Sequence, residues 1–166
     1  MKVTVTQIRA IAVNVFREAL RDRILLIMCG TGIGVMAFSI VLGELAVGAR
    51  TRVIQNTGFW VIGLWGLLTV LYLGSNVIRR EIHLQTIYLV LSRPVSRNTF
   101  MAGKYAGMLL VLTVVFAVLA AAFAVLLHAF GIDLTPAYGW TLLFLLGEWI
   151  LLAGFSLLFE IGRAHV

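Results

Sequence analysis

The chain has 166 residues, of which 61% are hydrophobic and 12% charged, and its mean hydropathy is +1.05. Average soluble proteins contain about 25% charged and about 45–50% apolar residues, and one core of this chain length cannot cover so much apolar surface, so a soluble domain is excluded. A net charge of +6 on so apolar a chain indicates a membrane protein with cationic loops rather than a nucleic-acid binder, and the single cysteine excludes an intrachain disulfide and a cysteine-rich metal cluster.

The first 23 residues predict an amphipathic helix. Their apolar side chains recur at helical spacing, at Ile8, Ile11, Ala12, Val15 and Ala19. Four basic side chains accompany them, Arg9, Arg17, Arg21 and Arg23. We expect this helix to lie along the cytoplasmic membrane surface, with Arg17, Arg21 and Arg23 as interface anchors. The alternative is a soluble helical extension of the first membrane span.

Four apolar stretches are long enough to cross a bilayer as helices, residues 24–43, 58–78, 105–127 and 139–159. A bilayer core about 30 Å thick requires about 20 helical residues, and backbone groups in lipid must be paired within the segment. Transmembrane strands would alternate in polarity over about 10 residues, and these stretches do not alternate. The first stretch follows a long charged leader, so it is not a cleavable signal peptide.

Small residues within the spans have the spacing that allows two helices to pack closely. Such pairs are Gly30 with Gly34, Gly103 with Gly107, and Ala117 with Ala121. The three glycines between residues 30 and 34 also have the spacing of part of a dinucleotide-binding loop. That loop follows a strand, and here the glycines lie inside an apolar span. We therefore expect these residues to serve helix packing.

Lysine and arginine residues are distributed unevenly among the loops. Residues 1–23 and residues 79–104 hold five each, whereas the segment between the first two spans holds only Arg50 and Arg52, and residues 128–138 hold none. Because basic loops remain in the cytoplasm, we expect a multi-pass protein of the plasma (inner) membrane with a cytoplasmic N-terminus. Trp60 and Trp140 lie at the starts of spans and are expected to be further interface anchors.

The cytoplasmic segment 79–104 predicts a stiff lever between spans two and three. A short amphipathic helix is indicated by the spacing of Leu84, Ile87, Tyr88 and Leu91. Pro94 ends this helix, and Ser96 can cap the helix that leads into the third span. Because both ends of the lever continue into membrane helices, it can pass the motion of a partner directly into the spans.

The same segment resembles the ABC-2 type transporter permeases. The resemblance is carried by Arg80-Glu81, Gln85-Thr86-Ile87-Tyr88, Leu91-Ser92-Arg93-Pro94-Val95-Ser96-Arg97 and Gly103-Lys104-Tyr105-Ala106-Gly107. These runs match a family pattern of a Glu, a Thr, an L-S-K/R-P-V-S-R string and a following G-K-Y/L-x-G. His83 and Leu84 depart from it, because the family often has a second acidic and a basic residue there. The resemblance extends over residues 17–159.

The resemblance implies a six-helix membrane subunit, of which four helices are present here. Two such subunits, forming a homodimer or heterodimer, would associate with two separate ATP-binding subunits. The residues that would contact the ATPase are Arg79, Arg80, Glu81, Gln85, Thr86, Ser92, Arg93 and Pro94. The basic residues of this segment, with Arg97 and Lys104, have a simpler alternative role, which is to bind anionic lipid headgroups as membrane anchors. This chain has no P-loop sequence, so no cofactor is expected on it, and ATP and magnesium are expected on the partner.

Glu148 is the single charged residue within residues 139–159. A carboxylate inside a span is costly unless it faces the bundle interior, pairs with another group or becomes protonated. We favour packing or a hydrogen bond inside the bundle. The alternatives are a direct contact with substrate, or a shifted span that brings Glu148 close to an interface.

The last seven residues, EIGRAHV at positions 160–166, follow the fourth span directly. They are the residues that a common sequencing-library adapter encodes, and the next triplet of that adapter is a stop codon. We therefore expect residues 1–159 to be the N-terminal part of one transmembrane permease domain and residues 160–166 to be an adapter artefact. The alternative is an ordinary cytoplasmic tail.

The sequence thus predicts an all-α, polytopic transmembrane helical bundle. The function it favours is a permease subunit that couples ATP hydrolysis on a separate subunit to export across a bacterial or archaeal plasma membrane. The first alternative is a non-transport membrane anchor or mechanotransmitter that uses the same lever to regulate a partner. An intramembrane enzyme is disfavoured, because no arrangement of Ser, His and Asp or of Cys and His fits the predicted topology.

Overall fold

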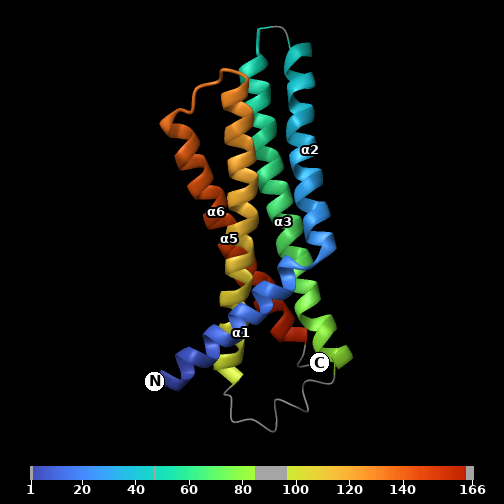
Figure 1. The fold of residues 1–166 in the computed structure, drawn as a ribbon, viewed down its shortest axis with the longest axis vertical. Helices are drawn as coiled ribbons and strands as arrows, with labels where there is room; N and C mark the ends of the chain where they lie inside the picture. The colour runs from blue at the N-terminus through green and yellow to red at the C-terminus, as the bar shows by residue number, and fades with distance from the viewer. Residues whose placement is uncertain (1, 47, 85–96, 164–166) are drawn as a thin grey trace.

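The computed structural model describes residues 2–46, 48–84 and 97–163, with side chains over residues 5–46, 48–75 and 99–159. The described residues form five α-helices and no strand. These helices are α1 (Lys2–Leu20), α2 (Arg23–Leu45), α3 (Arg50–Leu84), α5 (Arg97–Ala129) and α6 (Pro136–Arg163). Helices α2, α3, α5 and α6 form a long bundle, and α1 lies across one end of it (Figure 1). The predicted helical fold class is confirmed.

The four bundle helices are long and apolar enough to cross a membrane. Their apolar parts run over Arg23–Leu45, Arg50–Ser75, Thr99–Ala129 and Pro136–Phe159. Each of the four helices contains one predicted span, so the four predicted spans are confirmed as helices. Helix α3 continues without a break through residues 79–84, which the sequence assigned to the lever, and α6 continues to Arg163. The continuation of α6 does not test the assignment of residues 160–166 to an adapter.

Local sequence explains where these helices begin and end. Asp22 caps α2, because its side chain accepts a hydrogen bond of 3.0 Å from the backbone N–H of Ile24. Gly48 and Gly131 have φ values of +76° and +67° in the two connections at the other end of the bundle, a backbone conformation that favours glycine. Pro136 begins α6, a position where its missing N–H costs nothing. We call the end of the bundle that carries the two short loops the connected end. The opposite end, where α1 lies and where α3 ends and α5 begins, we call the loop end (Figure 1).

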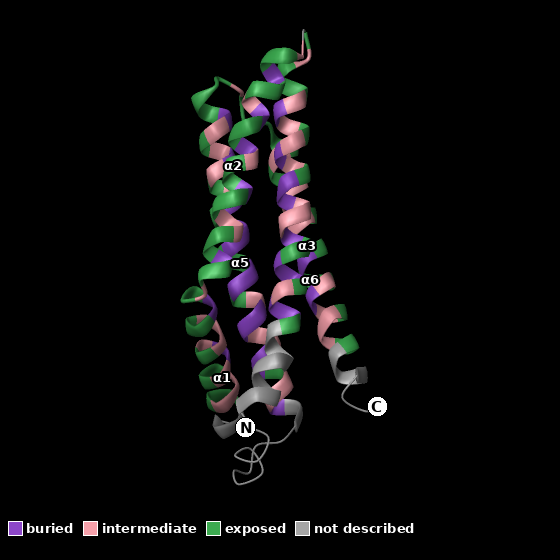
Figure 2. Cartoon of the chain, turned by 90° about the vertical axis from the view of Figure 1, so that its right-hand side faces the viewer, coloured by how far each residue is buried: buried purple, intermediate pink, exposed green. Residues whose placement is uncertain are grey.

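Helix α3 packs against its neighbours through glycines. Gly58 and Gly66 are buried, and each has an aromatic ring where its side chain would begin, Phe123 of α5 and Trp149 of α6 respectively. Gly74 meets the side chain of Ser156 of α6 in the same way. Buried residues follow these inner faces, whereas the outer faces of the bundle are exposed (Figure 2). The glycines allow helix backbones to approach closely and put bulky side chains into the gaps.

Helices α2 and α3 are joined by a similar contact with a hydrogen bond added. Trp65 of α3 lies against Gly32 of α2, where a side-chain carbon would be 2.9 Å from the indole ring. Its indole N–H donates a bond of 2.7 Å to the backbone oxygen of Met28. Helices α5 and α6 are also joined by a hydrogen bond, in which the hydroxyl of Tyr138 in α6 donates to the backbone oxygen of Ala120 in α5 at 2.9 Å. The polar groups of Trp65 and Tyr138 are thus paired with backbone oxygens of neighbouring helices.

The predicted small-residue contacts are confirmed in one place. The side chains of Ile11 and Val15 in α1 lie against Gly103 and Gly107 of α5, as close packing requires. Around Gly30 and Gly34, by contrast, no described atom lies within 4 Å of the points where side chains would begin. Ala117 and Ala121 are exposed. Packing at these four positions was predicted, and it does not occur among the described residues.

Candidate functional site

The predicted lever lies between the loop-end termini of two bundle helices. Arg79, Arg80 and Glu81 belong to the last turns of α3, which ends at Leu84, and Arg97 is the first residue of α5. The remaining predicted contact residues, Gln85, Thr86, Ser92, Arg93 and Pro94, lie outside the described residues. Helix α5 begins one position after Ser96, where the sequence predicted a cap. The segment 85–96 therefore connects two membrane-length helices along the chain.

Helix α1 packs on α5 close to the start of that helix. A side-chain carbon at Gly107 would lie 2.8 Å from Cβ of Val15 and 3.0 Å from the backbone oxygen of Ala12. Ala12 and Ala19 are buried. The amphipathic helix predicted for residues 1–23 is confirmed over Lys2–Leu20, with its apolar stripe facing protein, whereas Arg21 and Asp22 lie in the junction and Arg23 begins α2. Its position at the membrane surface stays a prediction.

The basic residues of α1 and its junction with α2 face outward. Arg9, Arg17, Arg21 and Arg23 are exposed, on the side that does not contact α5. Exposure is what the anchoring of Arg17, Arg21 and Arg23 at lipid headgroups requires, and that anchoring stays a prediction. Trp60 of α3 and Trp140 of α6 are also exposed on the outside of the bundle. Their role as interface anchors is compatible with this position.

Lys104 has different surroundings from the other predicted anchors. It is buried, with 9% of its surface exposed, and its ammonium nitrogen lies 4.6 Å from the centre of the Phe100 ring. A cation over an aromatic face is attracted by the negative charge density of the ring. The neighbouring Gly103 contacts Ile11 of α1. Lys104 thus lies in the region where α1 meets α5, and its binding to headgroups stays a prediction.

A hydrogen bond that the sequence did not predict joins α3 to the junction of α1 and α2. The hydroxyl of Tyr72 donates a bond of 2.5 Å to one carboxylate oxygen of Asp22, whose other oxygen caps α2. A tyrosine and an aspartate fifty residues apart share no local pattern, so the sequence carried no signal for this pair. Helix α1 therefore lies on α5, while its end is attached to α3. Both helices that lead to the segment 85–96 meet the N-terminal region.

Glu148 lies on the outward face of α6. It is exposed, and among the described residues it forms no hydrogen bond or ion pair. It lines a shallow groove of about 530 Å³ on α6 together with Leu143, Phe144, Gly147, Leu151, Leu152 and Phe155. The bundle-internal bond that we favoured is not formed within the described chain. The physical reason is the orientation of α6 about its own axis. Because Trp149 faces the bundle interior, the adjacent Glu148 faces outward.

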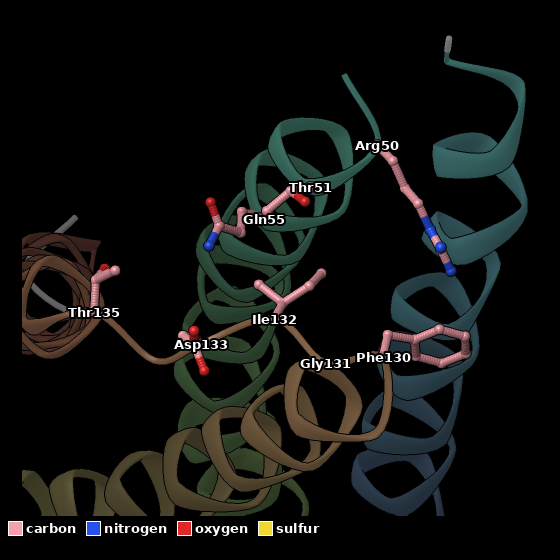
Figure 3. Close-up of a pocket in the computed structure, with 8 residues that line it drawn as sticks. All are labelled: Arg50, Thr51, Gln55, Phe130, Gly131, Ile132, Asp133 and Thr135. Atoms are coloured by element: carbon pink, nitrogen blue, oxygen red, sulfur yellow. The ribbon is translucent and has the colours of Figure 1, made fainter. Parts of the chain in front are cut away.

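A polar cleft lies at the connected end of the bundle (Figure 3). The start of α3 contributes Arg50, Thr51 and Gln55, and the connection between α5 and α6 contributes Phe130, Gly131, Ile132, Asp133 and Thr135. Arg50 pairs with Glu44 at 2.7 Å and lies 5.7 Å from the centre of the Phe130 ring. Both partners of this ion pair are exposed, so it adds little to stability. The cleft, of about 430 Å³, offers hydroxyl, amide and carboxylate groups for hydrogen bonding.

Metal chemistry has no candidate in the part of the chain that the structure describes. No three His, Cys, Asp or Glu side chains there are grouped so that they could hold an ion.

A family model described as an ABC-2 family transporter protein matches residues 20–163. No curated protein matches the chain. The matched region includes α2, α3, α5 and α6, together with the lever segment.

Proposed function

Because this chain belongs to the ABC-2 transporter family, we propose that it is the membrane subunit that couples ATP hydrolysis on a separate subunit to export of a substrate. The family membership makes it a membrane transport component. Coupling and the direction of transport are what the proposal adds. In this proposal the segment 79–97 is the coupling element, and ATP and magnesium bind to the partner.

The observation that carries this proposal is the position of the segment between α3 and α5. Both helices run the length of the bundle, and both are held by contacts close to the loop end. Tyr72 of α3 is bonded to Asp22, and Gly103 of α5 lies against Ile11. Protein interiors are packed densely enough to transmit small displacements. A push on the segment 85–96 would therefore tilt or shift both helices, and α1 with them.

The partner contact is proposed to depend on charge and on the turn at proline. Arg79, Arg80 and Glu81 belong to the last turns of α3 and would contact the ATPase, and Pro94, which lies outside the described residues, would set the direction in which the chain returns. Basic residues of the segment also suit anionic headgroups, so Glu81 is the more specific probe of a protein partner.

The assembly we propose contains two permease subunits, alike or different, and two ATPase subunits in the plasma membrane of a bacterium or archaeon. The lysine and arginine distribution supports a cytoplasmic location for the N-terminus and for the segment 79–104. The connected end, with its polar cleft, would then face outward.

The test is co-purification with the soluble ATPase encoded by a neighbouring gene that contains a Walker A motif. The variant Glu81→Lys with Pro94→Ala should weaken association about tenfold, because it reverses a charge and frees the turn at the contact. Glu44→Lys with Pro136→Ala is the matched control, since it makes the same two changes at the connected end. The proposal fails if the first variant binds the ATPase and supports coupled ATP hydrolysis as well as the control does.

A further inference from the structure

Trp149 of α6 lies at a junction of three helices. It is fully buried, and its indole ring occupies the place where a side chain of Gly66 in α3 would begin. On α5, Phe116 meets the same indole ring edge to face, with ring centres 5.2 Å apart and an angle of 88°. One side chain of α6 thus fills the space between α3 and α5.

The two helices that hold Trp149 are the two that continue into the lever. Helix α6 is joined to α5 in the chain only at the connected end, so away from that connection it can follow the lever helices only through contacts. Because the interior is close-packed, a change in the spacing or register of α3 and α5 must displace a ring that fills the gap between them. Trp149 is therefore positioned to respond to relative motion of the two lever helices.

The contact works by shape rather than by hydrogen bonding. The indole nitrogen of Trp149 is buried and has no hydrogen-bond partner among the described atoms. Most buried indole N–H groups have a partner, as Trp65 has in Met28. The Trp149 ring is thus retained here by the space that Gly66 leaves and by the Phe116 ring.

Neighbouring contacts connect this junction to the rest of the bundle. Trp65, next to Gly66 on α3, lies against Gly32 of α2. Ile150, next to Trp149 on α6, accepts a hydrogen bond of 3.2 Å at its backbone oxygen from Tyr105 of α5. Glu148, on the other side of Trp149, faces outward. Movement of the Trp149 ring would carry the Glu148 face of α6 with it.

We infer that Trp149 is a positioning residue that transfers displacement of α3 and α5 to α6 during the coupling cycle. The inference rests on the proposed function, because it assumes that an ATPase moves the lever. In this inference α6 and α3 move together, because the Trp149 ring of α6 fills the gap at Gly66 of α3. The outward face around Glu148 is the part of the subunit that moves as a result.

The first experiment reconstitutes the permease with its ATPase in lipid nanodiscs and measures association and ATP hydrolysis separately. Trp149→Leu should assemble, and the change in ATPase rate caused by association should fall about fivefold, because the smaller side chain no longer fills the gap. Trp149→Phe should retain the rate to within about twofold, because the missing N–H had no partner. Leu158→Ala, on the exposed face of α6, is the control. Equal coupling by Trp149→Leu and the control would overturn the inference.

A covalent bypass distinguishes transfer of motion from a structural role. A side-chain carbon at Gly74 would lie 3.5 Å from Cβ of Ser156, which suits a disulfide between α3 and α6. In a Cys29→Ala background, Gly74→Cys with Ser156→Cys connects the same two helices about two turns away from the Trp149 contact. When oxidised, this pair should restore coupling to Trp149→Leu, and reduction should remove the restored coupling. If Trp149→Leu lost coupling only because its structure was disturbed, forming the disulfide would not restore coupling.

The same disulfide can be formed in a chain that retains Trp149. This variant tests the inference without shortening any side chain in the core. Because α6 is inferred to follow α3, oxidation should leave coupling unchanged. Loss of coupling on oxidation would mean that α6 slides along α3, which overturns the inference while ATPase association still supports the proposed function. Failure of the unsubstituted chain to bind the ATPase would overturn the proposed function, and the inference with it.

Discussion

The hydroxyl of Tyr72 and the carboxylate of Asp22 form a hydrogen bond of 2.5 Å that joins α3 to the junction between α1 and α2. Asp22 uses its other oxygen to cap α2. One carboxylate therefore determines both where α2 begins and how α3 is held against it. This pair lies next to the part of α3 that leads to the lever, so its loss should change the loop end more than the connected end.

Tyr72→Phe should lower the free energy of unfolding by about 2 kcal/mol, because hydrogen bonds to charged groups are worth about 1.5–3 kcal/mol. The measurement is reversible unfolding in mixed micelles. Tyr138→Phe is the matched control, since it removes a tyrosine hydrogen bond to a backbone oxygen, that of Ala120. Its acceptor is uncharged, so it should cost about 1 kcal/mol. An equal or larger loss in the control would contradict the importance given to the Asp22 contact.

Gly107→Ala should separate α1 from α5, because the added carbon would lie 2.8 Å from Cβ of Val15 and 3.0 Å from a backbone oxygen that cannot move alone. The rate of tryptic cleavage at Arg9 and Arg17 reports this separation and should rise. Gly30→Ala has open space around the new carbon, and alanine favours helix by about 1 kcal/mol over glycine. Its cleavage rate should not rise. The same increase in both variants would rule out a specific contact at Gly107.

Gly66→Ala should destabilise the bundle by about 1–3 kcal/mol, the usual cost of overpacking, because Trp149 already occupies the space. Gly63→Ala, one turn earlier on α3, would place its carbon 3.5 Å from Leu145, an ordinary contact distance. Its stability should be equal to or above that of the unsubstituted chain. Thermal unfolding of the two variants in the same detergent decides the matter, and equal midpoints would disprove the described packing of Trp149.

Glu148→Gln should leave the unfolding of the isolated subunit within about 0.5 kcal/mol of the parent, as expected for an exposed residue without partners. A loss above about 1 kcal/mol would mean that Glu148 bonds inside the subunit. Assembly into the complete transporter is measured separately by crosslinking, and should change, because an ionisable group on an apolar membrane face requires a partner or a cavity. Unchanged assembly together with unchanged transport would reject both specific roles of Glu148.

The fold was predictable because hydropathy reports how much apolar length a segment has. It does not report which side of a helix is buried. Helix α5 is apolar all around, so periodicity could not select Phe116 and Phe123 as its inner residues. A small residue indicates that another helix can approach, but it does not identify that helix. The sequence therefore gave the same prediction for Gly103 and Gly30. Only the first has a neighbour among the described residues.

The lever itself was recognisable because its motif is polar and local. The contacts around it were not, because they join distant segments. Neither Tyr72 with Asp22 nor Gly66 with Trp149 follows from spacing along the chain. The role of Glu148 stays a prediction for a related reason, since the cost of placing a charge in lipid indicates that a partner is needed and not that the partner belongs to the same chain.

The contact between α1 and α5 also has a consequence for biosynthesis. The ribosome completes α1 well before α5, so the apolar stripe of α1 is made before the helix that covers it. During that interval the stripe suits the surface of the bilayer, as amphipathic helices generally do. We therefore expect α1 to exchange lipid for Gly103 and Gly107 only after α5 has been inserted. A nascent chain arrested before α5 should then keep α1 at the lipid surface.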